Sequence, residues 1–157
     1  MKISIIMCVK NSMPYLMAAI KSFQKQRYKN KELIVVYSGS NDNSLYYLQS
    51  LHDKNIKLYT HNRTIYKSLN FGIKKSKGDI IGILHSDDVF FDELVLEKIS
   101  LAYKKTNTDI VYGNILYSNK NNLLNIKRIW NNININKKFK IPPHTSTFIK
   151  KEICKKN

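Results

Sequence analysis

Two adjacent carboxylates, Asp87 and Asp88, follow an apolar run in the segment GILHSDDVF at residues 82–90. Neighbouring carboxylates repel each other unless a positive group lies beside them. A hard divalent cation such as Mg²⁺ or Mn²⁺ takes one or two protein carboxylates and completes its shell with phosphate oxygens and water. The pair therefore predicts a metal site for a phosphorylated ligand. The alternative, which the pair by itself favours, is a cap on the helix that follows.

A second polar segment, GSNDNS at residues 39–44, follows another apolar run, KELIVVYS at residues 31–38. Gly39 and Ser40 permit a tight turn whose backbone amides can hold a phosphate or a base. Neither G-x-G-x-x-G nor G-x-x-x-x-G-K-[ST] occurs in the chain, which disfavours a dinucleotide fold and a phosphate-loop enzyme. A response-regulator receiver is disfavoured as well, because it carries its acids after the first and third strands.

The elements that must position these segments alternate between strand-like and helix-like patterns. We expect strands at residues 2–9, 31–38, 56–60, 80–85 and 109–118. We expect helices at residues 11–26, 44–51, 65–76 and 91–106, with Ser12 as the first N-cap and Ile65, Leu69 and Ile73 on one face of the third helix. This alternation predicts the α/β class with a mainly parallel sheet, whose ligands bind outside the carboxyl ends of the strands. The two polar segments are therefore expected to converge on one pocket.

The character of the sequence changes after Asn119. An Asn- and Lys-rich stretch loses the alternation, and we expect a hairpin and a long loop there. The last segment, TSTFIKKEICKKN, predicts a short strand and the first turn of a helix. We therefore divide the chain into an α/β domain at residues 1–118 and a second, incomplete region at residues 119–157.

The composition is that of a globular chain of 157 residues, long enough to bury a core. No apolar stretch approaches the roughly 20 residues that span a bilayer, and no cleavage site follows the first apolar run. Cys8 and Cys154 do not make a disulfide framework, so a cytoplasmic protein is expected. The net charge of +16 indicates attraction to nucleic acid, to an anionic membrane face or to a phosphorylated substrate. An equally weighted alternative is a mere compositional bias towards Lys, Asn and Ile.

Five segments together resemble a known family. They are SIIMCVKN, ELIVVYSGSNDNS, IYKSLNFGIKKSKGDIIGILHSDDVF, DIVYGNILY and PPHTSTFIKKEI. Their order and spacing resemble the family 2 glycosyltransferases with the GT-A fold, most closely the bacterial members that build surface polysaccharides. The resemblance implies a Rossmann-like α/β domain that binds a nucleotide-diphosphate sugar donor at residues 1–118, and an acceptor-side region at residues 119–157.

The resemblance also implies roles for individual residues. Asp87 matches the metal contact for Mg²⁺ or Mn²⁺, with Asp88 beside it, and His144 matches a position near the acceptor, where a structural role is the alternative. The implied donor-binding residues are Val9, Asn11, Ser38, Gly39, Ser40, Asp42, Asn70, His85 and Ser86. Asp79 also matches a family acid, but we favour a turn-capping role for it.

Three positions depart from the family pattern. His85 stands where the family often has an acid, and Tyr37 stands where many members have an Asp that contacts the base. Tyr37 would stack on the base or, as we favour, simply fill space. The general base that inverting members use comes after the segment TFIKKE, and the chain ends at Asn157 before it, so we expect a truncated protein.

The functional expectation is an inverting, metal-assisted sugar transferase of polysaccharide or lipopolysaccharide synthesis. Its partners would be a nucleotide-diphosphate sugar and a saccharide or lipid-linked acceptor, with peripheral contact at the inner face of the cell membrane. The first alternative is a donor-binding remnant without turnover. The second is a basic nucleic-acid-binding domain, which is least favoured because the ten tyrosines fall at core-like positions.

Overall fold

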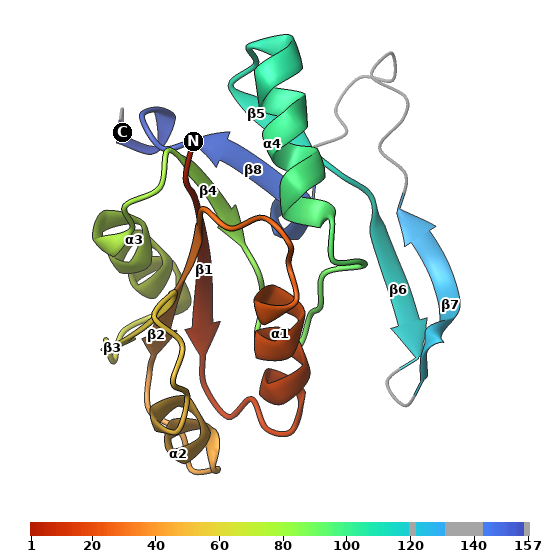
Figure 1. The fold of residues 1–157 in the computed structure, drawn as a ribbon. Coiled ribbons are helices and arrows are strands. Elements are labelled where there is room, and N and C mark those ends of the chain that lie inside the picture. The colour runs from red at the N-terminus through yellow and green to blue at the C-terminus, as the bar shows by residue number, and fades with distance from the viewer. Residues whose placement is uncertain (120–121, 131–142, 156–157) are drawn as a thin grey trace.

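The computed structural model describes residues 1–119, 122–130 and 143–155. Within them, six strands form one sheet and two further strands form a separate hairpin (Figure 1). The strands are β1 (Ile3–Val9), β2 (Lys31–Tyr37), β3 (Ile56–Thr60), β4 (Ile80–Ile83), β5 (Ile110–Tyr112), β6 (Ile115–Asn119), β7 (Asn122–Trp130) and β8 (Thr147–Lys150). The helices are α1 (Tyr15–Gln24), α2 (Ser44–Gln49), α3 (Ile65–Lys75) and α4 (Val95–Thr106), and the 3-10 turns η1 (His144–Ser146) and η2 (Ile153–Lys155) flank β8.

The main sheet has the strand order β3-β2-β1-β4-β8-β5. β3, β2, β1 and β4 run parallel, whereas β8 runs antiparallel to both β4 and β5. The expected α/β fold with a mainly parallel sheet is therefore confirmed. The strand expected at residues 56–60 coincides with β3, and every expected helix is present with its ends within four residues of the expectation.

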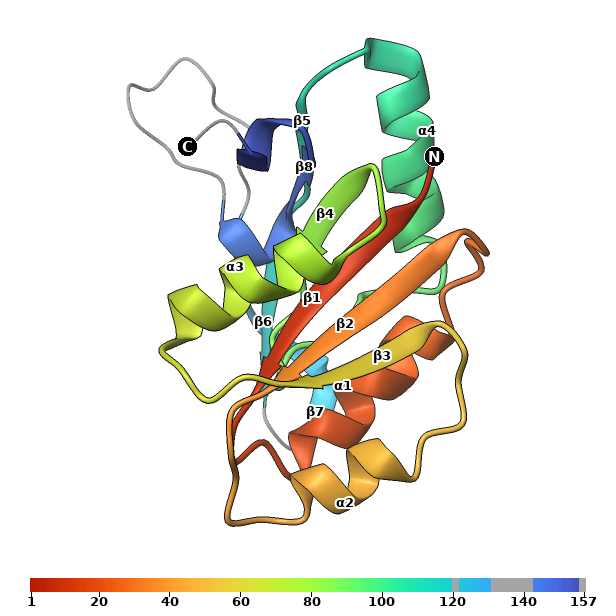
Figure 2. The same ribbon diagram turned by 90° about the vertical axis from the view of Figure 1, so that its left-hand side faces the viewer.

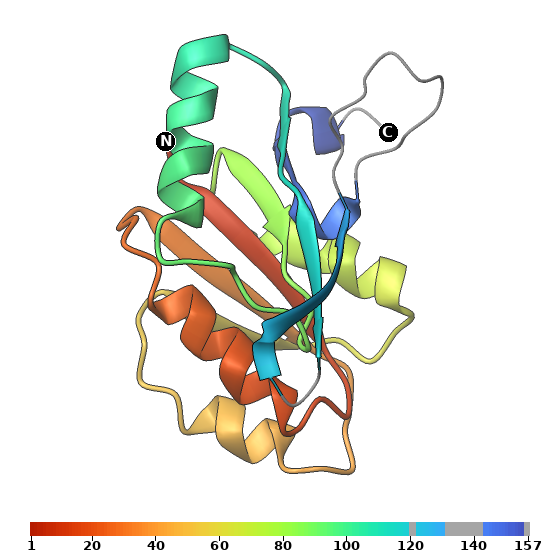
Figure 3. The same cartoon turned by 90° about the vertical axis from the view of Figure 1, so that its right-hand side faces the viewer.

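Helices cover both faces of this sheet (Figures 2 and 3). α1, α2 and α4 pack on one face, where the fully buried side chains include Leu16, Phe23 and Leu96. α3 packs on the opposite face, against residues such as Ile6 and Ile34. Successive residues of a strand point to opposite faces, so the continuous apolar sequence of β1 supplies both cores.

α3 lies close to the sheet because small residues face it. A Cβ atom at Gly72 would lie 2.6 Å from the Cγ2 atom of Ile6. The buried residues of α3 are Ser68 and Gly72, whereas Ile65 is 50% exposed. Of the three residues expected on one face of this helix, Leu69 and Ile73 pack against the core, whereas Ile65 in the first turn is exposed.

The single strand expected at residues 109–118 is wrong. The segment splits at Gly113 into β5, which belongs to the main sheet, and β6, which pairs with β7. The backbone N–H of Gly113 donates to the carbonyl of Ser146, and the carbonyl of Gly113 accepts from the Ser146 hydroxyl. These contacts replace strand pairing just before β8 begins, so the chain leaves the main sheet at that point.

A hairpin is expected after Asn119, and the structure contains the hairpin β6–β7, which stands beside the main sheet (Figure 1). Its second strand lies in the expected stretch, but its first strand ends at Asn119, so the hairpin begins earlier than expected. The long loop expected after the hairpin lies at residues 131–142, outside the described residues. The expected terminal strand is β8, and η2 follows it. The boundary between residues 118 and 119 falls inside β6, and β8 lies within the main sheet, so the division into two regions stays a prediction about function.

Candidate functional site

Three loops meet at the carboxyl ends of β1, β2 and β4. The loop after β1 is joined to the loop after β2 by three hydrogen bonds. The N–H of Asn11 donates to Ser40 Oγ at 2.9 Å, the N–H of Asn41 donates to Asn11 Oδ1 at 2.8 Å, and the N–H of Met13 donates to Asp42 Oδ2 at 2.9 Å. The predicted convergence of these segments is therefore present in the fold, as it is in parallel sheets generally.

Ser12 connects the same loops to the loop after β4. Its hydroxyl lies 2.7 Å from the hydroxyl of Ser86, 74 residues away in the sequence. Its backbone N–H donates to Ser44 Oγ at 3.3 Å. The sequence pattern predicted that Ser12 caps the first helix. This prediction is wrong, because α1 begins only at Tyr15 and has no side-chain cap. Ser12 is thus a residue of the site that sequence reasoning missed.

Two residues of these loops have a left-handed backbone. Asn11 has a φ of 50° and Gly39 a φ of 80°. Glycine adopts this conformation without strain, and asparagine tolerates it better than most residues. Backbone geometry, together with the hydrogen bonds of Asn11 and Ser40, therefore fixes the shape of both loops.

Tyr37 is part of the core beneath the site. Only 7% of its surface is exposed, and its hydroxyl accepts a hydrogen bond of 2.7 Å from the N–H of Ser40. The ring is therefore not available to stack on a base, and the favoured space-filling interpretation is confirmed. The hydroxyl additionally holds the turn around Gly39.

The acidic pair lies at the surface after β4. Both Asp87 and Asp88 are exposed, and neither forms an ion pair within the described part of the chain. Desolvation of the Asp88 carboxyl and then the charge of Asp87 raise the pKa of Asp88, while His85 and His144 act in the opposite direction.

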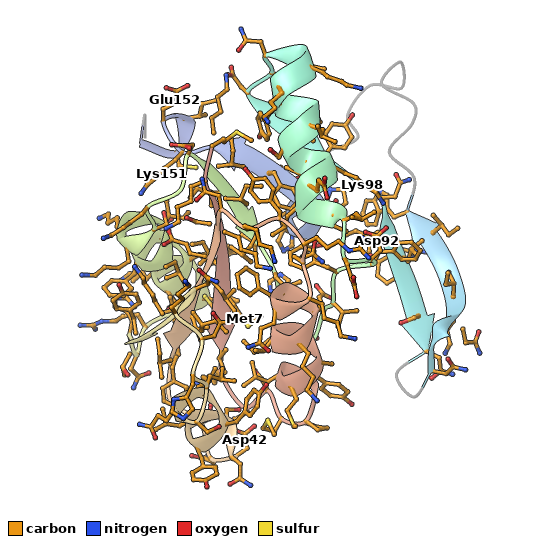
Figure 4. The ribbon with its side chains drawn as sticks, in the orientation of Figure 1. Met7, Asp42, Asp92, Lys98, Lys151 and Glu152 are labelled. Atoms are coloured by element: carbon orange, nitrogen blue, oxygen red, sulfur yellow. The ribbon has the colours of Figure 1, made fainter. Side chains whose placement is uncertain are left out.

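The helix-cap alternative for this pair is wrong. α4 begins at Val95, and its N-cap position is Leu94. The acid that contacts the start of this helix is Asp92. Its carboxylate accepts a hydrogen bond of 2.8 Å from the N–H of Leu94 and forms an ion pair of 2.6 Å with Lys98 (Figure 4). The carboxylates of Asp87 and Asp88 therefore remain open to a cationic ligand.

Two histidines meet beside the acidic pair. His85 follows β4, and His144 belongs to η1, yet their Nε2 atoms lie 2.9 Å apart and their rings meet edge to face at 83°. At this distance the two rings share a hydrogen bond, in which the N–H of one ring donates to the bare nitrogen of the other. The segment before β8 is thereby brought to the acidic motif, a contact that the sequence did not predict.

The remaining predicted residues differ in their surroundings. Val9 is fully buried, and its carbonyl accepts from the N–H of Ser38. The Ser38 hydroxyl donates to the carbonyl of His61 at 3.1 Å. Asn70 is exposed on α3, and none of the hydrogen bonds found for the described residues joins it to these loops.

Asp79 lies at the opposite end of the sheet. Its carboxylate accepts from the N–H of Lys2 at 2.7 Å. The favoured turn-capping role for Asp79 is therefore wrong, because the N–H groups of Lys77 and Gly78 in its turn donate to Glu32 and Ser4 instead. His61 is a second residue that sequence reasoning missed, because only the fold brings its ring, stacked on Phe71 at 4.4 Å, beside the loop after β2.

The acidic pair has the ligand chemistry of a partial metal site. Among the described residues, no group of three or more His, Cys, Asp or Glu side chains is arranged to hold one ion. Mg²⁺ and Mn²⁺ commonly take one or two carboxylates and obtain their remaining ligands from phosphate and water. Asp87 and Asp88 fit an ion of this kind, which would arrive with a phosphorylated ligand.

The chain belongs to glycosyl transferase family 2, because the family model matches residues 4–153. This finding defines the class of protein to which the fold and the three loops belong. The family assignment and the GT-A fold expected from the sequence are therefore confirmed.

Curated relatives support the same class. The chain is 36% identical over 109 residues to an uncharacterized glycosyltransferase of Rickettsia typhi, which covers 69% of this chain and 34% of the relative. It is 32% identical over 124 residues to the UDP-Glc:alpha-D-GlcNAc-diphosphoundecaprenol beta-1,3-glucosyltransferase WfgD of Escherichia coli, covering 78% of this chain and 49% of WfgD. The chain thus spans between a third and a half of the length of these two relatives.

Solved structures share the fold. TarS 1–349 of S. aureus, determined in complex with UDP-GlcNAc, matches with a TM-score of 0.65 and 24% identity over 70% of this chain and 33% of TarS. The mannosyltransferase PcManGT from Pyrobaculum calidifontis, in complex with GDP-Man and Mn²⁺, matches with a TM-score of 0.64 and 17% identity over 78% of this chain and 37% of that protein. At these identities the similarity concerns the fold.

Proposed function

We propose that this chain binds a nucleotide-diphosphate sugar and transfers the sugar, with inversion, to a saccharide or lipid-linked acceptor. The observation that carries the proposal is the junction of three loops, in which Asn11, Ser12, Ser40 and Ser86 connect the ends of β1, β2 and β4 beside an acidic pair. In an open parallel sheet this is the edge at which ligands bind. The family to which the chain belongs makes a nucleotide sugar the matching ligand.

In this proposal the acidic pair holds Mg²⁺ or Mn²⁺, with Asp87 as the principal ligand and Asp88 beside it. The ion, when bound, neutralises charge on the diphosphate as it departs. PcManGT, which shares the fold, was determined with GDP-Man and Mn²⁺, and this supports the choice of ion class.

The polar loops would bind the rest of the donor. The turn at Ser38, Gly39 and Ser40 and the loop at Asn11 border the nucleotide, and Asp42 stabilises that loop through the N–H of Met13. The side chain of Asp42 acts through the loop, because its carboxylate already accepts hydrogen bonds from the backbone N–H groups of Met13 and Ser44. The pKa of Asp42 is lowered first by the Ser44 side chain and then by the hydrogen bond from the N–H of Met13.

The acceptor would approach from the side of η1, where His144 contacts His85. WfgD, which carries a diphosphoundecaprenol acceptor in its name, supports a lipid-linked acceptor and a place in polysaccharide or lipopolysaccharide synthesis. Such an acceptor resides in a membrane, so the proposal includes peripheral contact with the membrane at its cytoplasmic face. Within the described residues no helix has both the length and the apolar character needed to cross a bilayer.

Calorimetry with the 157-residue protein tests donor binding. UDP and GDP are titrated in the presence of Mn²⁺ and again after chelation, and we expect binding that requires the ion. Transfer is then measured with radiolabelled nucleotide sugars and saccharide or lipid-linked acceptors. Binding without transfer would contradict the transfer step for this chain, and absence of both would contradict the proposal altogether.

A further inference from the structure

One stretch of the chain carries positive charge without any acidic residue. Between Asp53 and Asp79 the sequence contains seven basic residues and no acidic one. The seven are Lys54, Lys57, Arg63, Lys67, Lys74, Lys75 and Lys77. They belong to β3, α3 and the segments beside them, and the two elements contact each other through the rings of Tyr59 and Phe71.

We define the basic α3 face as Arg63, Lys67, Lys74, Lys75 and Lys77. All five residues are exposed. None of them forms an ion pair within the part of the chain that the structure describes. By contrast, α4 carries Glu97, and its Lys98 pairs with Asp92.

Lys67, Lys74 and Lys75 lie on α3, and Arg63 and Lys77 flank its two ends. Ser68 and Gly72 point to the sheet, and the helix covers the face opposite α1 (Figure 2). Its 11 residues give a length of about 16 Å at 1.5 Å per residue. The basic side chains are therefore distributed over a surface wide enough to contact several phosphate groups at once.

The first turn of α3 adds exposed apolar surface to the positive charge. Tyr66 is 76% exposed and Ile65 is 50% exposed. A tyrosine ring with neighbouring aliphatic surface and lysines is the combination that settles at a membrane–water interface. A site for single-stranded nucleic acid instead needs several exposed rings on which successive bases stack.

We propose that the basic α3 face binds the anionic phospholipid headgroups of a bilayer, with Tyr66 and Ile65 at the interface. The lysines supply the electrostatic attraction. The apolar first turn makes the N-terminal end of α3 the end that contacts the bilayer. α3 begins shortly after His61, whose carbonyl accepts from Ser38 in the loop after β2. The proposed contact therefore brings the end of α3 nearest to the candidate donor site to the bilayer surface.

This contact would present the site to a lipid-linked acceptor, and in that respect alone it rests on the proposed function. Binding to lipid itself requires only the charges and the exposed first turn. The two proposals can therefore fail separately, since nucleotide binding and vesicle binding are measured on the same preparation.

Vesicle sedimentation tests the contact. We expect the protein to sediment with phosphatidylcholine vesicles containing 30% phosphatidylglycerol at low salt, and not with pure phosphatidylcholine. The triple variant Lys67→Glu, Lys74→Glu, Lys75→Glu should lower the affinity at least about tenfold. The control Lys21→Glu, Lys104→Glu, Lys105→Glu makes the same change of charge on α1 and α4 and should lower it less than about threefold. Tyr66→Ser should weaken binding without altering its salt dependence.

Equal losses in the two triple variants would overturn the proposal, because net charge rather than the basic α3 face would then account for binding. Binding to random duplex DNA that is lost in the α3 variant, without any vesicle binding, would overturn it in favour of nucleic acid. Circular dichroism and urea denaturation establish that each variant is folded. Vesicle binding without nucleotide binding would support the α3 face and contradict the proposed function.

Discussion

The two ends of the main sheet use carboxylates in opposite ways. At the amino end, Glu32 is almost completely buried, and its carboxylate lies 2.6 Å from both Lys2 Nζ and Ser4 Oγ. At the carboxyl end, Asp87 and Asp88 are exposed and without an ion pair among the described residues. Figure 4 marks these ends by Lys151 and Glu152 on one side and Asp42 on the other.

The comparison shows how the function of an acid depends on its partners. Every contact of Glu32 is supplied by the protein, so its charge contributes to folding. The charges of Asp87 and Asp88 repel each other, and no cation of the described residues forms an ion pair with them. The predictions that follow test whether the amino end stabilises the fold and the carboxyl end binds the ligand.

The largest effect is expected for Glu32→Gln. The substitution leaves Lys2 and the buried hydroxyl of Ser4 without their carboxylate, which should lower the free energy of unfolding by about 3 kcal/mol. Urea denaturation followed by circular dichroism measures the loss. Glu93→Gln, which alters an exposed pair with Arg27, should change stability by less than about 1 kcal/mol. Equal effects of the two substitutions would contradict a special structural role for the buried carboxylate of Glu32.

The pH dependence of stability in acid should be determined in part by the ionisation of Glu32. Burial by itself raises the pKa of this carboxyl, but the hydrogen bonds from Lys2, Ser4 and the N–H of Lys77 outweigh it and lower the pKa below the ordinary 4.5. A lowered folded-state pKa stabilises the fold above the ordinary value, and this contribution is lost as the pH falls through the folded pKa. Stability below pH 4.5 should therefore fall less steeply in Glu32→Gln than in the wild type.

Asp87→Asn tests the other end of the sheet. Mn²⁺-dependent binding of UDP should weaken at least about 100-fold, equivalent to about 2.8 kcal/mol, because the carboxylate proposed as the principal metal ligand loses its charge. The stability of the protein without metal should change by no more than about 0.5 kcal/mol. Calorimetry compares this variant with Asp109→Asn, which removes an exposed acid far from the loops. Unchanged binding in Asp87→Asn would contradict a metal role for the pair.

Tyr37→Phe should have a smaller effect, and it should affect both the stability of the fold and the binding of nucleotide. It removes the hydroxyl that accepts from the N–H of Ser40, at a cost of about 1 kcal/mol of stability. Nucleotide binding should weaken only a few-fold, because the loop loses one anchor and no ligand contact. Tyr46→Phe, at a position that is 79% exposed, is the control for both measurements.

The smallest effect is expected for Asp88→Asn without metal. Removing one of two adjacent negative charges should raise the free energy of unfolding at pH 7 by up to about 0.5 kcal/mol. Added salt should reduce this gain, because it screens the repulsion between exposed charges. Loss of stability in this variant would indicate that Asp88 has a structural partner, as Glu32 has.

The sequence predicted the strands and helices well where their patterns are local. The apolar runs of β1 and β2 and the helical spacing of α1 specify their own conformations. It failed at residues 109–118, because the break at Gly113 depends on Ser146, a partner distant in the sequence. It also misassigned Ser12, whose hydroxyl bonds to Ser86 across 74 residues instead of capping a helix.

By itself, the sequence determined the α/β class, the family and the position of the acidic pair after a buried strand. These follow from periodicity and from the order of short motifs, which are properties of neighbouring residues. Only the tertiary structure decided that Tyr37 is core, that His85 meets His144 and that the lysines of α3 share one surface. The physical reason is that burial, hydrogen bonding and the gathering of charge depend on contacts between distant segments, which form only when the sheet and its helices pack together.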